Sequence, residues 1–380
     1  MRHGCYHRYR RMVTNVFAGR RSSLPAPPRS WQCECKRVVF FRNSRCLACN
    51  TPLGYDPYSF RLLPLHPGPE PGVWIAAGVH KRKPRLYRRC ANIETASGCN
   101  WLLREGEPAF CICCRLNRTI PDLSVNGNEV LWSRIEMARR RVVSSLIALR
   151  LPVRSKIEDP ENGLAFDLLA SPPGGPRVLT GHLNGVVTIN IEEAEDARRE
   201  QTRQEMGEPY RTVVGHVRHE LGHYYWDRLV RDTRWIEPFR ELFGDERADY
   251  TEGLRLNREL GPPSGWHRQY ISAYASSHPW EDWAETWAHY MHMLDTLATG
   301  TSSGIGRDSV DLPFEPFTSE VLWHPDSTDF LDLLNSWIRL STALNELARA
   351  MGQHDFYPFA LPKAAGAKLQ FIHELIQAGS

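Results

Sequence analysis

The sequence predicts an α+β fold in which a cysteine-rich N-terminal module precedes a mainly helical domain with a small sheet. Three observations lead to this prediction. All ten cysteines of the 380-residue chain occur before residue 115. From about Asn128 onward, apolar side chains recur at helical spacing in several long segments. Between these segments, residues 186–191 alternate apolar and polar side chains, as expected of a half-buried strand.

The overall composition is that of a globular protein, with no indication of a membrane partner. Apolar residues make up 42% and charged residues 24% of the chain, and the net charge is +3. A charge this small does not by itself indicate binding to nucleic acid. No apolar run approaches the roughly 18–20 residues that cross a bilayer. Residues 1–30 contain seven arginines and no acidic residue, so we expect a basic disordered tail there.

The cysteines fall into two clusters, which we assign to residues 31–120. Close pairs of cysteines, each facing another pair about 10–20 residues away, are typical of a tetrahedral zinc site with four thiolates. We therefore predict up to two structural zinc ions, with disulfides as the alternative. The predicted ligands are Cys33, Cys35, Cys46 and Cys49 in the first cluster and Cys90, Cys99, Cys111 and Cys114 in the second. Cys33 and Cys35 are one residue closer than the usual spacing, and Cys5 and Cys113 are left as free thiols.

Short elements are expected within this region. Residues 38–41 are apolar and predict a strand between the two halves of the first cluster. Residues 64–72, rich in proline and glycine, predict a connector between the clusters. A basic run follows, which is more typical of a solvated surface than of a nucleic-acid site: Lys81, Arg82, Lys83, Arg85, Arg88 and Arg89.

The second predicted domain, residues 121–380, begins with a long amphipathic helix from about Asn128 to Leu149. Residues 139–141 lie mostly off its apolar face. Residues 181–191 then predict a turn and a strand, and residues 192–206 a solvated helix. A buried helix is expected over residues 212–230, followed by helices over residues 280–296 and 329–351.

The buried helix carries the run His219-Glu220-Leu221-Gly222-His223, which fits the H-E-x-x-H pattern. Residues four apart lie on one face of a helix, so His219 and His223 can reach a single ion. A catalytic zinc ion keeps one coordination position open for water. Glu220 follows the first ligand and can take a proton from that water as a general base. His216, three residues earlier, is expected to be satisfied within the core.

Two histidines leave the zinc ion one ligand short. The extended metzincin pattern needs Gly at 226 and His or Asp at 229, but Trp226 and Leu229 stand there. The segment after Pro279 offers Glu281 and Glu285, which share a helix face, so that one can bind the metal while the other orients a ligand imidazole. Asp245 is the alternative third ligand.

The block from Glu281 to Glu285 resembles the third-ligand helix of gluzincin metallopeptidases. The resemblance implies that Glu281 binds zinc and that Glu285 is the acidic residue that orients a ligand. In the lethal-factor group of gluzincins, a tyrosine seven residues before the ligand donates to the oxyanion. Tyr274 stands at that distance here. His278 is a candidate second donor to the oxyanion, or a residue at the start of the helix.

Most of the chain also resembles a bacterial family of zinc-binding metallopeptidases with an N-terminal zinc ribbon. The resemblance covers residues 33 to about 290 and implies a zincin-like metallopeptidase domain. The matching stretches are CECKRVVFFRNSRCLACNTPLGY, CNWLLREGEPAFCICCRLNRTIPDLS, GHVRHELGHYYWDRLV, LFGDERADY and SAYASSHPWEDWAETWAHY.

Together these observations predict a cytoplasmic zinc metallopeptidase that acts on peptides or proteins, with one catalytic zinc ion. The predicted strand at residues 186–191 would be the sheet edge along which an extended substrate pairs. The competing hypothesis is a zinc-ribbon protein that binds protein or nucleic acid and carries a relic peptidase domain.

Overall fold

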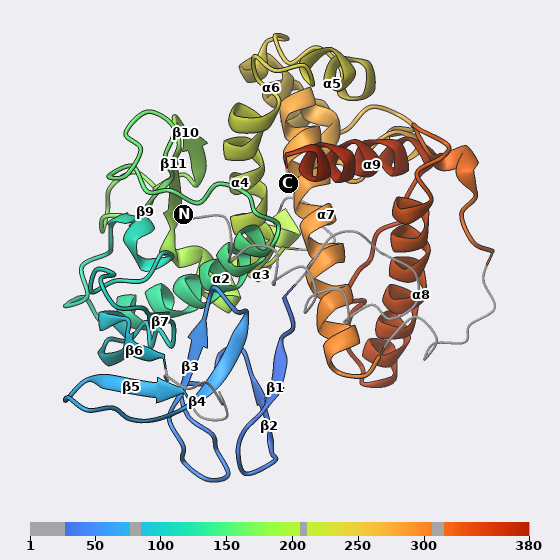
Figure 1. Ribbon diagram of the computed structural model, residues 1–380. Coiled ribbons are helices and arrows are strands. Elements are labelled where there is room, and N and C mark those ends of the chain that lie inside the picture. The colour runs from blue at the N-terminus through green and yellow to red at the C-terminus, as the bar shows by residue number, and fades with distance from the viewer. Residues whose placement is uncertain (1–26, 77–84, 206–210, 306–314, 380) are drawn as a thin grey trace. The chain divides into compact units, whose positions relative to one another are not determined.

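The computed structural model describes residues 27–76, 85–205, 211–305 and 315–379 (Figure 1). The chain forms two compact units, Pro27–Arg228 and Leu229–Ser380. Residues 1–26, most of the predicted basic tail, lie outside the described residues. The first unit contains both cysteine clusters and nearly all of the helix that bears the H-E-x-x-H run.

The N-terminal part of the first unit is built from two small antiparallel sheets. Strands β1 (Ser30–Gln32) and β2 (Val38–Phe40) pair with each other, which confirms the strand predicted between the halves of the first cluster. The second sheet has the order β3-β4-β5-β6-β7. Its strands are β3 (Leu53–Asp56), β4 (Arg61–Pro67), β5 (Val73–Ala76), β6 (Leu86–Arg89) and β7 (Leu102–Leu103).

The connector predicted at residues 64–72 is wrong for its first part, because Pro64 lies inside strand β4. Pro64 pairs with Leu53, while the neighbouring Leu65 donates its N–H to the carbonyl of Pro52 at 2.8 Å. The proline, which has no N–H, therefore occupies a position where strand β4 donates no hydrogen bond to β3. Leu63 and Leu65 join the buried core of this sheet with Ala76, Tyr87 and Leu102, and that burial outweighs the local preference of proline for a loop.

The rest of the first unit combines helices with a four-stranded sheet. Helix α2 (Asn128–Ala148) confirms the predicted amphipathic helix, but Arg139 and Arg140 are buried in it and do not face solvent. The sheet has the order β10-β11-β9-β8. Its strands are β8 (Asn117–Thr119), β9 (Ala165–Leu169), β10 (Gly181–Leu183) and β11 (Val186–Asn190).

The predicted strand at residues 186–191 exists as β11, but the prediction that it forms a sheet edge is wrong. β11 lies between β10, its antiparallel partner, and β9, its parallel partner. Asn184 and Gly185 form the turn with positive φ of 49° and 77°, so the segment predicted as turn and strand is a hairpin. The edge on this side is β10.

Two helices complete this unit. Helix α3 (Asp196–Glu205) confirms the predicted solvated helix, and α4 (Val213–Leu229) carries the H-E-x-x-H run. The hydroxyls of Tyr224 and Tyr225 donate to the carbonyls of Asn162 and Pro152, both at 2.9 Å. These bonds fasten α4 to loops that lie more than sixty residues earlier in the sequence.

The second unit is helical in its described residues. The aromatic ring of Trp283 on α7 contacts Phe239, Phe243 and Phe371, so α7 is packed from two sides. The α-helices are α5 (Ile236–Phe243), α6 (Tyr250–Leu260), α7 (Pro279–Ser302), α8 (Thr328–Ala350) and α9 (Lys363–Ala378). Short 3-10 helices occur at η4 (Trp266–Arg268), η5 (Tyr274–Ser277) and η7 (Ser319–Val321).

The predicted fold class is confirmed: a cysteine-rich region with small sheets precedes a mainly helical part. Within the described residues, no helix is both long enough and apolar enough to span a membrane.

Candidate metal centres

Helix α4 presents His219 and His223 on one buried face. Their rings lie 4.9 Å apart between centroids and meet edge to face. Both side chains are buried, as is Glu220 between them in the sequence. A buried helix with two imidazoles one turn apart offers nitrogen ligands of the kind that zinc binds.

Glu220 has one oxygen engaged and one without a partner. Its Oε1 lies 3.2 Å from Nε2 of His216, one helical turn earlier. Its Oε2 is buried and has no hydrogen-bond partner among the described residues. A buried carboxylate oxygen in that state is unusual and suits a group that receives a proton from an incoming water molecule. Burial opposes ionisation of Glu220, but His216 outweighs it and lowers the pKa of the carboxyl group.

His216 is held from its other side by Glu193. The Nδ1 atom of His216 contacts Glu193 Oε2, so each ring nitrogen faces a carboxylate. Burial disfavours the charged ring, yet the two carboxylates raise the pKa of His216 to about 9. Despite its own burial, Glu193 has a pKa lowered to about 2 by His216, Thr180 and Arg211. The expectation that His216 is satisfied holds, and its partners include the predicted general base.

In the second unit, Glu281 is a buried carboxylate in the first turn of α7, 1% exposed. Tyr250 at the start of α6 donates its hydroxyl to Glu281 Oε1 at 2.6 Å. Tyr250 carries no signal in the sequence, because no spacing rule connects residues on two different helices. The bond fixes the Glu281 side chain in a way that is common for carboxylates that bind metals.

Asp282, next to Glu281, is buried and paired with Lys368 of α9. Lys368 Nζ lies 2.5 Å from Asp282 Oδ2 and also donates to the carbonyl of Gln269 at 3.0 Å. Burial raises the pKa of Asp282 to about 7. This pair ties the first turn of α7 to α9 and so limits the movement of Glu281.

The other predicted residues of this unit surround the same turn. Glu285 accepts a hydrogen bond from the Ser272 hydroxyl at 2.7 Å, which holds it in place. His278 is the N-cap of α7: its Nδ1 accepts from the Trp280 N–H, and its Nε2 lies 3.1 Å from the Ala248 carbonyl. Both nitrogens are therefore engaged, which makes His278 a helix cap and leaves it unsuited to donate to an oxyanion. Tyr274 begins η5.

Asp245, the alternative third ligand, differs from Glu281 in its surroundings. Its carboxylate is about half exposed and makes two bonds of 2.8 Å with the guanidinium of Arg247. This arginine holds the pKa of Asp245 well below its usual range. Of the two candidate carboxylates, the buried Glu281 is the one whose environment resembles a metal ligand.

The first cysteine cluster brings together all four predicted thiols. Cys33, Cys35, Cys46 and Cys49 converge, despite the short spacing of the first pair. The Cys33–Cys49 and Cys35–Cys46 sulfurs are 3.7 and 3.6 Å apart. Sulfurs around a tetrahedral zinc ion lie about 3.8 Å apart, as follows from a Zn–S bond of about 2.3 Å, whereas a disulfide needs about 2.05 Å. The donor set therefore fits zinc, and these four cysteines form no disulfide in this structure.

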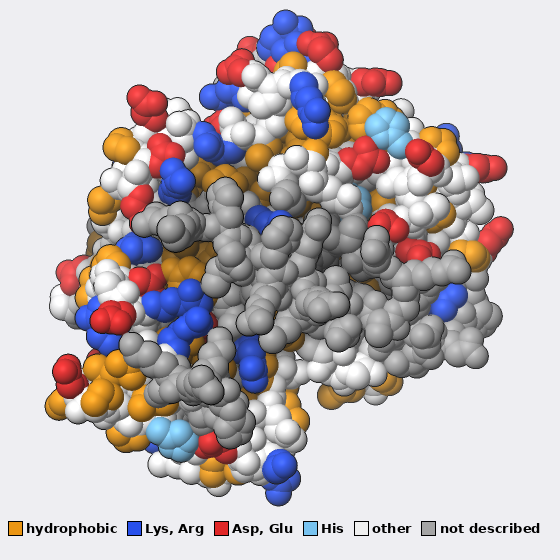
Figure 2. Space-filling view, viewed as in Figure 1, with side chains coloured by type: hydrophobic (Ala, Val, Ile, Leu, Met, Phe, Trp, Pro, Cys, Tyr) orange, Lys and Arg blue, Asp and Glu red, His pale blue; other side chains and the backbone are white. Residues whose placement is uncertain are grey.

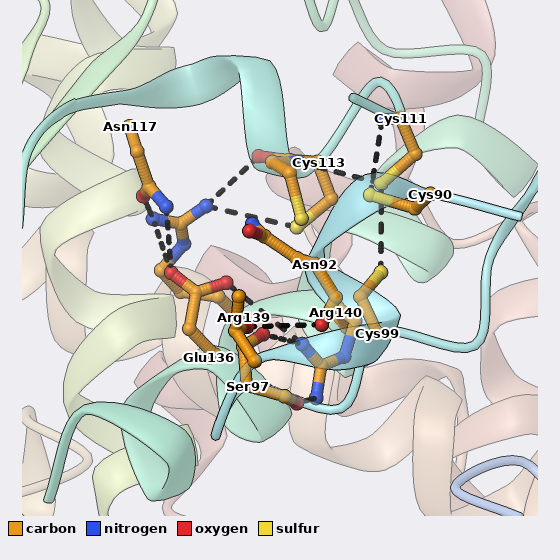
Figure 3. Close-up of polar contacts among 12 residues, drawn as sticks. Cys90, Asn92, Ser97, Cys99, Cys111, Cys113, Asn117, Glu136, Arg139 and Arg140 are labelled. Carbon is orange, nitrogen blue, oxygen red and sulfur yellow. Dashed lines mark hydrogen bonds and ion pairs between the residues drawn. The ribbon is translucent and has the colours of Figure 1, made fainter. Parts of the chain in front are cut away.

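The second cluster has the same chemistry in a buried setting (Figure 3). Cys90, Cys99, Cys111 and Cys114 converge, and all four are buried. The Cys99 and Cys111 sulfurs are 3.7 Å apart. Backbone N–H groups of Cys111 and Cys114 point at the sulfurs of Cys90 and Cys111, at 3.4 and 3.5 Å. Such donors stabilise thiolates, so this set also fits zinc.

Two buried arginines of α2 hold the loops that carry this cluster (Figure 3). Arg140 donates to the hydroxyl and the carbonyl of Ser97, at 2.7 and 2.8 Å. Arg139 donates to the Cys113 carbonyl at 2.9 Å, and its Nη2 lies 3.7 Å from the Cys113 sulfur. Glu136 lies 3.3 Å from Arg139 and 3.9 Å from Arg140. Four thiolates with one zinc ion would carry a net charge of −2, and the two guanidinium groups would offset only part of it, because Glu136 balances one of their charges.

Comparison with known proteins identifies the two parts of the chain. The family described as "Putative zinc-binding metallo-peptidase" matches residues 128–375, and a "zinc-ribbon domain" matches residues 30–125. The chain belongs to this family of zinc-binding metallopeptidases. The resemblance noted from the sequence is thereby confirmed, including the zinc ribbon at the N-terminus.

Similar proteins occur in mycobacteria. The chain is 37% identical over 351 residues to "Uncharacterized protein Rv2568c" of Mycobacterium tuberculosis and to "Uncharacterized protein Mb2598c" of Mycobacterium bovis. Each match covers 92% of this chain and 95% of the relative. No solved structure matches the chain.

Proposed function

We propose that the protein hydrolyses peptide bonds at a zinc ion held by His219, His223 and Glu281, with Glu220 as the general base. The observation that carries the proposal is the buried Oε2 of Glu220, which has no hydrogen-bond partner in the described chain, beside two buried histidines on α4. Membership of the metallopeptidase family supports the same chemistry. Burial of Glu281 and its bond to Tyr250 support the choice of third ligand.

In this mechanism the protein groups position and move protons. A bound zinc ion would polarise the scissile carbonyl and make the attacking water more acidic. Glu220 is ionised at neutral pH because its pKa is lowered, so it can accept the proton of that water and pass it to the leaving amine. Tyr274 would donate a hydrogen bond to the carbonyl oxygen as negative charge develops there. Glu285 would orient one of the histidine ligands.

We further propose one structural zinc ion in each cysteine cluster, in addition to the catalytic one. The sulfur–sulfur separations of 3.6–3.7 Å support both sites. None of the described cysteines forms a disulfide, which favours a reducing compartment and hence the cytoplasm.

The substrate we propose is an extended peptide segment, paired with the edge strand β10 instead of with β11. For the ribbons, a protein partner is favoured over nucleic acid. On the described part of the face drawn in Figure 2, basic and acidic side chains are interspersed. Within the predicted basic run, Lys81–Lys83 lie outside the described residues, while Arg88 and Arg89 donate to backbone carbonyls of the ribbon.

The test measures zinc per chain and cleavage of unfolded casein. Wild type should hold about three zinc ions and cleave casein. Glu220→Gln should keep the zinc and lose activity by a factor on the order of 10²–10⁴, because the general base is removed. Glu281→Ala should lose one zinc ion. The matched controls are Glu237→Gln, an exposed carboxylate, and Asp245→Ala, the alternative ligand; both should behave as wild type.

Three results would overturn the proposal: wild type that holds only cysteine-bound zinc, activity that survives Glu220→Gln, or loss of a zinc ion in Asp245→Ala but not in Glu281→Ala. The first result would favour the competing hypothesis of a zinc-ribbon binding protein with a relic site.

A further inference from the structure

We infer that His216 is a positioning residue for Glu220, and that Glu193 fastens it to the sheet of the first unit. This inference rests on the proposed function, since it assigns His216 a task in the same reaction. His216 does not need to contact substrate or metal for this task. It acts on the orientation of the general base.

The geometry places His216 between two carboxylates. His216 and Glu220 are four residues apart on α4, so their side chains lie on one face of the helix. The Nε2 atom of His216 lies 3.2 Å from Glu220 Oε1, and its Nδ1 atom contacts Glu193 Oε2. A ring with one carboxylate on each nitrogen cannot turn without breaking one of the two contacts.

Glu193 is itself fixed by elements outside α4. It lies in the 3-10 helix η3 (Ile191–Ala194), which follows β11 directly. Its Oε1 accepts a hydrogen bond from the Thr180 hydroxyl, and Arg211 approaches its Oε2 at 3.8 Å. The Asn190 side chain caps η3 by accepting from the N–H of Glu192 at 3.0 Å. The position of Glu193 is thus set by the end of a central strand.

This arrangement fixes one oxygen of Glu220 and leaves the other available. Glutamate has three side-chain torsions, so an unrestrained Glu220 would spend much of its time with the carboxylate turned away. The contact of Oε1 with His216 restricts these torsions. The buried Oε2, which has no partner among the described residues, is then held ready to accept a proton.

A purely structural role is the alternative, in which His216 only fastens η3 to α4. The chain offers a matched control for that role. Tyr224, on the same helix, donates its hydroxyl to the carbonyl of Asn162, 62 residues earlier. Tyr224→Phe therefore removes a comparable long-range bond of α4 and keeps the aromatic ring in place.

The first experiment compares casein cleavage, zinc content and thermal stability of full-length variants. His216→Leu should lower kcat about 10- to 100-fold with KM and zinc content unchanged. Residues that orient a functional side chain typically change activity by this factor. His216→Gln, whose amide can still donate to Glu220, should recover part of that loss. Glu193→Gln should lower kcat less than His216→Leu. Tyr224→Phe should keep the wild-type kcat even where it lowers the melting temperature.

The second experiment does not depend on activity. Crystal structures of zinc-loaded wild type, His216→Leu and Tyr224→Phe should show the Glu220 carboxylate displaced in His216→Leu alone. An unmoved Glu220 in His216→Leu, or a kcat loss equal in Tyr224→Phe, would overturn the inference. An inactive wild type would overturn the proposed function instead, and the crystal structures would still decide whether His216 positions Glu220.

Discussion

The two cysteine clusters each bring four cysteines together, but in opposite surroundings. In the first, Cys35 and Cys49 are exposed, and the cluster is framed by the small hairpin of β1 and β2. In the second, all four cysteines are buried, and the flanking loops bond to Arg139 and Arg140 of α2. The difference shows that the same arrangement of four cysteines can lie either beside an exposed hairpin or inside a domain.

The largest difference in stability between variants is expected when one cysteine is removed from either cluster. Cys111→Ser should lose the second zinc ion and destabilise the unit Pro27–Arg228 by several kcal/mol, because metal binding energy there contributes to folding of a shared core. Cys35→Ser should lose the first zinc ion and disturb mainly the hairpin. Zinc analysis, together with hydrogen exchange along α2 and α4, distinguishes these outcomes.

Equal protection of α2 in both variants would contradict the comparison, since it would mean that the buried cluster contributes no more to the unit than the exposed one does.

A smaller effect, on zinc affinity, is expected when one of the buried arginines beside the second cluster is replaced. Arg140→Met should weaken zinc binding at the second cluster about 10- to 100-fold and leave the first cluster unchanged, because it removes the bonds to Ser97 and a buried positive charge. Competition with a chromogenic chelator measures both sites. Arg134→Met, on the same helix but bonded to the exposed Asp196, is the control and should retain both affinities.

The smallest effect should come from Cys113→Ser. Cys113 is buried beside the second cluster, and burial raises the pKa of its thiol to about 12, so it stays neutral. It does not belong to the four converging thiols. Serine is similar in size and can accept a bond from Arg139, so we expect both zinc ions to remain and a loss of stability under about 1 kcal/mol. A lost zinc ion would show that Cys113 is a ligand.

Features of the sequence that depend on local spacing predicted much of the structure. The helical periodicity from Asn128 became α2, and the proline at 279 begins α7. The cysteine spacings predicted both clusters, including the pair that is one residue short. Each of these predictions needs only residues within about 25 positions of one another along the chain.

What the sequence could not provide depends on partners far along the chain. Arg139 and Arg140 read as solvated charges because their partners Cys113 and Ser97 lie 26 and 43 residues away. Glu193 stands in a run of charged residues, and only the fold brings it to His216. The position of β11 inside its sheet likewise depends on its pairing with β9, about twenty residues earlier.

The catalytic assignments of Glu220 and Glu281 are predictions that the variants above decide. The roles of Glu285 and Tyr274 and the domain division at residues 120 and 121 also stay predictions.

The boundary between the zinc ribbon and the peptidase part decides whether either can be produced alone. The ribbon match ends at residue 125 and the peptidase match begins at residue 128, which invites a cut between them. Several contacts cross this cut. Without the ribbon, Arg139 and Arg140 of α2 would lose the backbone carbonyls to which they donate, and Ser144 would lose its hydrogen bond with the hydroxyl of Tyr55, 2.7 Å away. A peptidase fragment without its ribbon would expose its own interior and should aggregate when expressed alone.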